Sequence, residues 1–196
     1  MTTTTNRPTP TSPQRLLSVV DYHRMAEVGI LSADERLELI HGHILEKMPK
    51  GPAHSALCKR IEKLLEGRLG AQVLVRLQDP IRINDYSEPE PDIAVVRPEP
   101  SFYAEQHPSP AEVFLLIEIA DTSLSRDLNI KANLYAAAGI QDYWVIDLST
   151  QQLHSFRAPR PDGYERQTIL RGQQTIGLQA FSDCTFTVQD LFGSGS

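Results

Sequence analysis

Apolar residues recur along the chain with two different periods, which predict helices and strands. Steps of three and four residues predict helices over residues 16–28, 53–69 and 127–138. Short continuous or alternating apolar runs predict strands at 72–77, with a continuation at 80–83, and at 92–96, 113–119 and 143–147. The mixture of both kinds of segment favours an α/β (α+β) fold, with a mixed sheet flanked by helices.

The order of these segments also predicts pairings. The alternating runs on either side of His41-Gly42 predict a β-hairpin, and residues 152–157 and 164–170 predict a peripheral C-terminal β-hairpin. The most continuous apolar run, 113–119, predicts a central strand covered on both faces. A helix leads from it to 143–147, which predicts parallel pairing of these two strands.

Three further segments have weaker patterns. Ser32 is followed three residues later by Glu35, which resembles a helix capping box. Residues 97–110 hold four prolines without clear periodicity, which predicts a surface loop. Residues 186–192 are expected to pack back on the domain.

Lys131 interrupts the apolar face of the helix predicted over 127–138. Leu128, Lys131, Leu134 and Tyr135 recur at the three- and four-residue steps of that face. An unpaired buried charge costs several kcal/mol or loses its proton. The ammonium therefore either snorkels to solvent or is held against carboxylates.

Two carboxylates upstream are suitable partners for this lysine. Asp92 opens one predicted strand and Glu118 lies at the end of the central strand, on the expected face of Phe114 and Leu116. If these strands are antiparallel neighbours, the start of one meets the end of the other and the carboxylates approach. Such hard oxygen ligands suit Mg²⁺ or Mn²⁺. Lys131 would then orient or deprotonate the attacking water and stabilise charge at the phosphorus.

Each of the three residues also has a purely structural explanation. An aspartate that opens a strand is often a turn residue, a glutamate that closes one is often an edge carboxylate, and a lysine can snorkel. Their combination carries more weight than any one alone. Together they outline a metal-dependent hydrolytic site.

Composition limits the alternatives. With 196 residues, 40% of them hydrophobic and 22% charged, the chain is expected to form one globular domain over residues 15–192. Residues 1–14 are rich in Thr and Pro and predict a disordered lead rather than a signal peptide, and 193–196 (Gly-Ser-Gly-Ser) predict a linker or tag remnant. No segment approaches the roughly 20 apolar residues of a membrane span. The two cysteines, Cys58 and Cys184, suggest neither a zinc site nor a disulfide framework, and a cytoplasmic location is expected.

The formal net charge of −6 argues against a general DNA-coating protein. It does not exclude an enzyme, because an acidic metal site adds negative charge that divalent ions neutralise. One helix carries a candidate basic strip, although a solvated face balanced by Glu62 and Glu66 is the favoured interpretation. The strip comprises Lys59, Arg60, Lys63 and Arg68.

Three segments resemble one protein family. LELIHGHILEKMPKGPAHSAL, EPEPDIAVVR and LLIEIADTSLSRDLNIKANLYAAAGIQDYWVIDL are similar to the Uma-two family of restriction endonucleases, within the PD-(D/E)XK nuclease superfamily. The resemblance spans residues 37–148. It implies a restriction-endonuclease-like mixed sheet flanked by helices, often in a homodimer, and Mg²⁺-dependent cleavage of phosphodiester bonds in DNA.

The resemblance also implies roles for individual residues. Asp92 would be the aspartate of the PD element and Glu118 the acidic residue of the second element, with the carbonyl of Ile119 as a further metal ligand. The usual lysine, two positions after the glutamate, is replaced here by Ala120. Lys131 matches family members in which this lysine has moved to the next helix.

Four more positions match the family with open alternatives. Glu38 is either an outer metal ligand or a solvent-facing residue of an edge hairpin. His54 is either a hydrogen-bonding or acid–base group near the phosphate or a residue that serves the start of its helix. Asp121 and Asp127 are either second-layer ligands or helix caps, and for Asp127 the cap is favoured.

The leading hypothesis is therefore a Mg²⁺- or Mn²⁺-dependent DNA endonuclease. The alternative is a catalytically silent module that keeps the nuclease fold for binding or regulation, favoured by the acidic net charge and the lack of a recognisable DNA-reading motif. Hydrolysis of RNA or another phosphodiester by the same site is a third possibility. A double-strand cut needs two sites, which makes a homodimer plausible.

Overall fold

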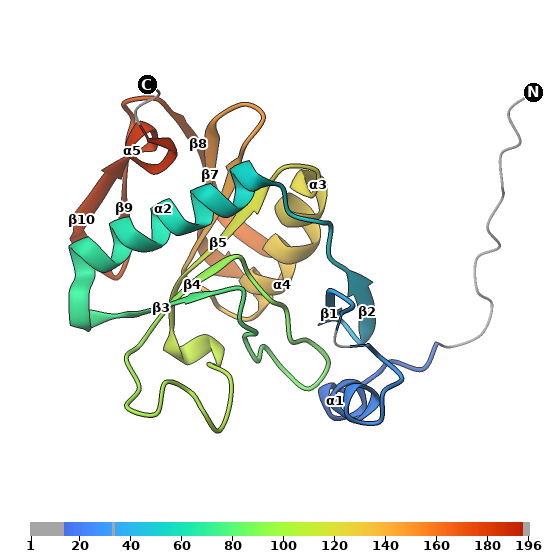
Figure 1. Ribbon diagram of the computed structural model, residues 1–196. Helices are drawn as coiled ribbons and strands as arrows, with labels where there is room; N and C mark the ends of the chain where they lie inside the picture. Colours follow the sequence, from blue (N-terminus) through green and yellow to red (C-terminus); the bar gives the residue numbers. More distant parts are fainter. Residues whose placement is uncertain (1–13, 33, 194–196) are drawn as a thin grey trace, which may run out of the picture.

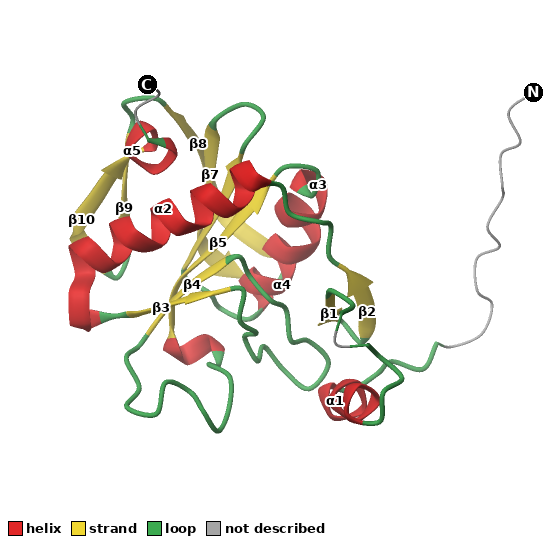
Figure 2. Cartoon of the chain, viewed as in Figure 1, coloured by secondary structure: helices red, strands yellow, loops and turns green. Residues whose placement is uncertain are grey.

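A six-stranded mixed sheet forms the centre of the protein (Figures 1 and 2). The computed structural model describes residues 14–32 and 34–193. The strand order is β3-β4-β5-β6-β7-β8, and every neighbouring pair is antiparallel except β5 and β6, which are parallel. The strands are β3 (Leu74–Leu77), β4 (Ile93–Val96), β5 (Val113–Ala120), β6 (Asp142–Asp147), β7 (Gln152–Arg160) and β8 (Gly163–Arg171). The predicted fold class and the parallel pair are confirmed.

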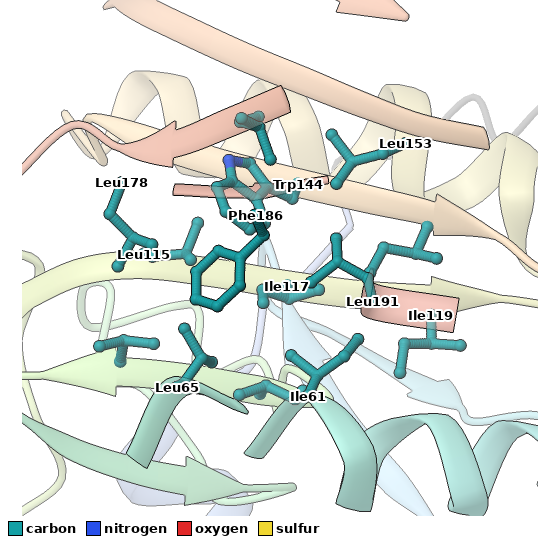
Figure 3. Close-up of a cluster of buried hydrophobic side chains, with 14 of the residues drawn as sticks. Ile61, Leu65, Leu115, Ile117, Ile119, Trp144, Leu153, Leu178, Phe186 and Leu191 are labelled. Atoms are coloured by element: carbon teal, nitrogen blue, oxygen red, sulfur yellow. The ribbon is translucent and has the colours of Figure 1, made fainter. Parts of the chain in front are cut away.

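One face of the sheet is covered by α2 (Pro52–Leu69) and the C-terminal elements. These are β9 (Thr175–Leu178), β10 (Phe181–Thr187) and α5 (Val188–Phe192). Figure 3 shows Ile61 and Leu65 of α2 packing with Ile117 of β5 and with Phe186 and Leu191 from the C-terminal elements. Burying such side chains contributes about 1.5–3 kcal/mol each. This core fixes α2, and with it His54, against one end of the sheet.

The opposite face carries the helical run that follows β5. It consists of α3 (Leu124–Arg126), a π-helical turn (Asp127–Lys131) and α4 (Ala132–Ala137). Leu134 and Tyr135 pack there with Leu116 of β5 and Tyr143 of β6. The apolar periodicity predicted the helix but not its π turn, which brings Lys131 to the end of the sheet.

The N-terminal elements lie beside that same end of the sheet (Figure 1). They are α1 (Val19–Glu27), β1 (Leu37–Ile40) and β2 (His43–Glu46). β1 and β2 form the predicted hairpin, and Glu88 N donates a hydrogen bond to Leu39 O. This contact attaches the hairpin to the loop that precedes β4.

Several boundaries differ from the sequence predictions. The first helix begins at Val19, and Ser18 and Asp21 form a capping box at its start that was not predicted. The predicted capping box of Ser32 and Glu35 does not begin a helix. Ser32 N does donate to Glu35, but the described residues that follow form a turn and then β1. Residues 80–83 are not a strand, because Ile81 is buried in a loop and donates to Pro89 O.

The predicted hairpin over 152–170 is confirmed, but it extends the central sheet as β7 and β8. A second hairpin, β9–β10, forms a separate two-stranded sheet, and Phe186, Val188 and Leu191 are buried as expected of residues 186–192. The predicted lead and tail lie outside the described residues except for Gln14 and Gly193. Within the described chain, no helix has both the length and the apolar character needed to cross a bilayer.

Candidate active site

Asp92 and Glu118 face each other at one end of the β4–β5 pair. Asp92 immediately precedes β4, and the register that pairs Ile93 with Ile117 continues to place Asp92 opposite Glu118. Both residues are buried, at 5% and 4% exposure. Ile119 N donates to Asp92 Oδ2 over 2.9 Å. The expected antiparallel arrangement is confirmed, and both carboxylates line one cavity.

Lys131 is held against carboxylates and does not snorkel to solvent. It is 3% exposed, and its Nζ lies 2.9 Å from Glu118 Oε1 and 3.1 Å from Glu38 Oε2. The hydroxyl of Tyr135 donates to the same Glu118 oxygen over 3.1 Å. Lys131 thus reaches Glu118 as expected. Asp92 instead accepts hydrogen bonds from His54 and the Ile119 amide.

Glu38 is part of the buried cluster and does not face solvent. It is 1% exposed, and its Oε2 also accepts from Glu90 N over 3.2 Å. Its Oε1 is buried without a hydrogen-bond partner among the described residues, and the nearest guanidinium nitrogen of Arg126 lies 3.9 Å away. One glutamate oxygen therefore remains for a ligand.

His54 approaches Asp92 from the first turn of α2. Its Nε2 lies 3.0 Å from Asp92 Oδ2, and because a carboxylate only accepts, Nε2 donates. On the other side of the ring, Cys58 Sγ lies 3.6 Å from Nδ1. Burial raises the pKa of the Cys58 thiol to about 12, so it stays protonated. Cys58 was not predicted, although its place four residues after His54 on a helix is a usable signal.

His54, Cys58 and Asp92 have ligand atoms within 4.8 Å of one another, close enough to hold a metal ion. The imidazole nitrogen nearest Cys58 is not the one that contacts Asp92. An ion at this place would need the Cys58 thiolate, whereas burial raises the pKa of that thiol to about 12. The carboxylates of Asp92 and Glu118 offer the better set for a hard cation.

The backbone of Ile119 fits the third expected ligand. Its N–H is directed at Asp92. In a strand, the N–H and C=O of one residue point toward the same neighbouring strand, so the Ile119 carbonyl is directed to the edge where Asp92 lies.

Negative charge exceeds positive charge in this buried cluster. Burial, together with the nearby carboxylates of Asp127, Asp92 and Glu38, raises the pKa of Glu118 to about 8 against the effect of Lys131. Burial also raises the pKa of Asp127. A divalent cation would offset this repulsion, so the donor set fits Mg²⁺ or Mn²⁺.

Two other groups keep their charged forms. Burial opposes ionisation of Asp92, but the hydrogen bond and charge of His54 and the Ile119 amide lower its pKa to about 2. Burial also opposes the ammonium of Lys131, but Glu118 and Glu38 outweigh it and raise its pKa. Lys131 is therefore protonated at neutral pH.

These groups line a cavity of about 50 Å³, room for a water molecule or a small ion. Asp121 lies at its wall and is exposed, and its role stays a prediction. Asp127 is buried and accepts from Ser123 Oγ over 2.5 Å. The favoured cap for Asp127 is wrong, because the helical run already begins at Leu124.

The prediction that Phe114 shares the sheet face of Glu118 is wrong. Leu116 and Glu118 do share the face that carries Lys131, but Phe114 packs into the opposite core. A register shift between Val95 and Val96 of β4 and their β5 partners inserts one extra residue and turns Phe114 over. The shift lies upstream of Glu118 and leaves its orientation unchanged.

Comparison with known proteins agrees with this architecture. A crystal structure of a putative nuclease belonging to DUF820 from Anabaena variabilis ATCC 29413 superposes with a TM-score of 0.68 at 18% sequence identity, covering 90% of this chain and 97% of that chain. At this identity the likeness shows the fold alone. No curated protein matches the chain. The family model described as "Putative restriction endonuclease" (Uma2) matches residues 19–189. The chain belongs to this Uma2 family.

Proposed function

We propose that the protein is a Mg²⁺- or Mn²⁺-dependent nuclease that hydrolyses phosphodiester bonds in DNA, acting in the cytoplasm as a single domain over residues 15–192. The observation that carries the proposal is the convergence of Asp92, Glu118 and Lys131, from three separate elements, in one buried cluster. Burying so many charges costs stability, and a purely structural role gives no reason for it.

Asp92, Glu118 and the carbonyl of Ile119 would hold the metal ion. When bound, the ion would supply positive charge that polarises the phosphate and activates water. His54 donates to Asp92 and fixes the orientation of its carboxylate. Glu38 in turn anchors the ammonium of Lys131 beside Glu118.

Lys131 acts as a hydrogen-bond donor rather than as a base. Its pKa is raised by the two glutamates, so it keeps its proton at neutral pH. A protonated lysine can orient a water molecule and stabilise negative charge that develops on a phosphate oxygen. Of the two roles considered for Lys131, orientation with charge stabilisation is the one the geometry supports.

The test is cleavage of supercoiled plasmid, single-stranded DNA and single-stranded RNA with Mg²⁺, Mn²⁺ or EDTA. Nicking or linearisation that requires metal is expected for the wild type, with DNA preferred to RNA. Asp92→Ala and Lys131→Ala should each lower the rate about 100-fold or more. Asp162→Asn, which removes an exposed carboxylate in a hairpin turn, should cleave like the wild type.

Absence of cleavage with every metal, in protein that still binds Mn²⁺, would contradict the proposal. That result would favour the alternative of a silent binding or regulatory module. Preference for RNA would keep the hydrolytic site and change the substrate. Since a double-strand cut needs two sites, we also propose a twofold homodimer, which sedimentation of the active protein would test.

A further inference from the structure

Lys50 has a buried ammonium group that the site as described does not use. Its side chain is 13% exposed, and its Nζ is inaccessible to solvent and lacks a hydrogen-bond partner among the described residues. The closest charged atom is Asp92 Oδ1, at 3.6 Å, beyond hydrogen-bond distance. A buried ammonium without hydrogen bonds is unfavourable. This arrangement leaves its donors available for an anion.

The other two lysines at the cavity are satisfied by the protein. Lys47 Nζ contacts the Glu90 carboxylate at 2.6 Å and the Glu90 carbonyl at 2.7 Å. Lys131 is paired with Glu118 and Glu38. Lys50 therefore differs from both neighbours, although all three line the same cavity.

The amino end of α2 adds positive electrostatic potential to the side of the cavity where Lys50 lies. Lys50 directly precedes Gly51, the N-cap of an 18-residue helix, and no side chain caps that end. The first amide groups and the helix dipole favour a negative group there. His54, in the first turn, reaches Asp92, so this helix end lies beside the metal ligands.

We propose that Lys50, together with the amino end of α2, binds a non-bridging oxygen of the substrate phosphodiester next to the metal ligands. The inference rests on the proposed function and adds a substrate-binding residue to it. With a cation held by Asp92, the Lys50 ammonium would be free to bind the phosphate. Its removal should therefore weaken substrate binding without weakening metal binding.

The experiment compares wild type with Lys50→Met, which keeps the apolar stem of the side chain, and with Lys50→Arg, which restores the charge. Arg160→Met is the matched control, because the Arg160 side chain is 59% exposed and pairs with Glu165 on the neighbouring strand. Three quantities are measured: Mn²⁺ affinity by titration, affinity for a short DNA duplex in Ca²⁺, and the plasmid cleavage rate in Mg²⁺. Melting curves establish that each variant is folded.

For Lys50→Met we expect Mn²⁺ affinity equal to or up to several-fold above that of the wild type. Duplex affinity and cleavage rate should fall about 10-fold or more, as for loss of a charged hydrogen bond, with partial recovery in Lys50→Arg. Arg160→Met should stay within about twofold in all three. A purely structural role for Lys50 would lower Mn²⁺ affinity and melting temperature together, and would overturn the inference.

Failure of the inference can be separated from failure of the proposed function. If wild type and Lys50→Met cleave and bind DNA equally, the phosphate role is wrong while the nuclease function stands. If the wild type binds the duplex but does not cleave it, nuclease activity is contradicted, and the duplex affinity of Lys50→Met still decides the role of Lys50. A wild type that neither binds nor cleaves DNA overturns both.

Discussion

Two buried carboxylates on the neighbouring strands β5 and β6 differ in the number and placement of their hydrogen-bond donors. Asp142, at the start of β6, is 0% exposed and accepts four hydrogen bonds shared between its two oxygens. Trp144 Nε1 and Arg157 Nε donate to Oδ1 at 2.9 and 3.0 Å, and Arg157 Nη2 and Gln179 N donate to Oδ2 at 3.1 and 2.8 Å. Asp142 thus has a local positive partner and a full set of donors.

Glu118, near the end of β5, lacks that compensation. Lys131 and Tyr135 both donate to one of its oxygens, and the carboxylate of Glu38 shares the same lysine. The two carboxylates therefore differ in how far the protein itself satisfies them. A satisfied ion pair holds the sheet to the C-terminal hairpin, whereas the crowded carboxylates store unfavourable energy that a bound cation would relieve.

The largest expected effect is on the free energy of unfolding. Asp142→Ala leaves the Arg157 guanidinium without its carboxylate, and removing one partner of a buried pair costs about 3–5 kcal/mol. Glu118→Ala in metal-free protein should cost far less, because a carboxyl group with a pKa of about 8 is mostly protonated at pH 7 and Lys131 stays paired with Glu38. Urea unfolding of both variants measures the difference. Equal destabilisation would contradict the distinction between the two sites.

Metal binding should stabilise only a protein with an intact cluster. At a Mn²⁺ concentration 100-fold above the dissociation constant, the expected gain is about 2.7 kcal/mol. Asp92→Ala and Glu118→Gln should lose this gain, while Asp162→Asn should retain it. Thermal melting with and without Mn²⁺ provides the measurement, and a gain that persists in Asp92→Ala would place the metal elsewhere.

The pH dependence of stability should distinguish the wild type from Glu118→Gln. Burial and the neighbouring carboxylates raise the pKa of Glu118 to about 8 in the metal-free protein, above the value of 4.5 for an unperturbed glutamate. The folded state therefore binds the extra proton, so its contribution is present below about pH 4.5 and is lost as pH rises toward 8. Across this window the wild type should lose stability relative to Glu118→Gln. A difference that is constant with pH would show that burial and like-charge repulsion do not raise the pKa of Glu118.

Much of this architecture could be predicted from the sequence, because buried positions in helices and strands are apolar and recur at regular intervals. The alternation of apolar residues identified the strands of the central sheet, and the order of segments predicted the parallel pair of β5 and β6. Charged residues at strand ends then indicated Asp92 and Glu118. Lys131 stood out because a charge on an apolar face requires a partner.

The features that were missed depend on contacts rather than on periodicity. The inserted residue at Phe114 depends on how β5 packs against the hydrophobic cores on its two faces. The π turn at Asp127–Lys131 depends on backbone hydrogen bonds, which the spacing of apolar residues does not encode. Lys50 lies in a loop, where no periodic pattern predicts orientation. Strands β9 and β10 expose much of one face, so their apolar signal is weak.

The most direct test of the central claim is the rate of plasmid cleavage by the wild type and Glu118→Gln in Mg²⁺, with EDTA as the control. The substitution keeps the size of the side chain and replaces the ionisable carboxyl group by a neutral amide. Metal-dependent cleavage that falls about 100-fold or more in Glu118→Gln, with the fold intact, is the predicted result. Equal cleavage by both proteins would contradict the account, because the buried carboxylate cluster would then play no part in the reaction.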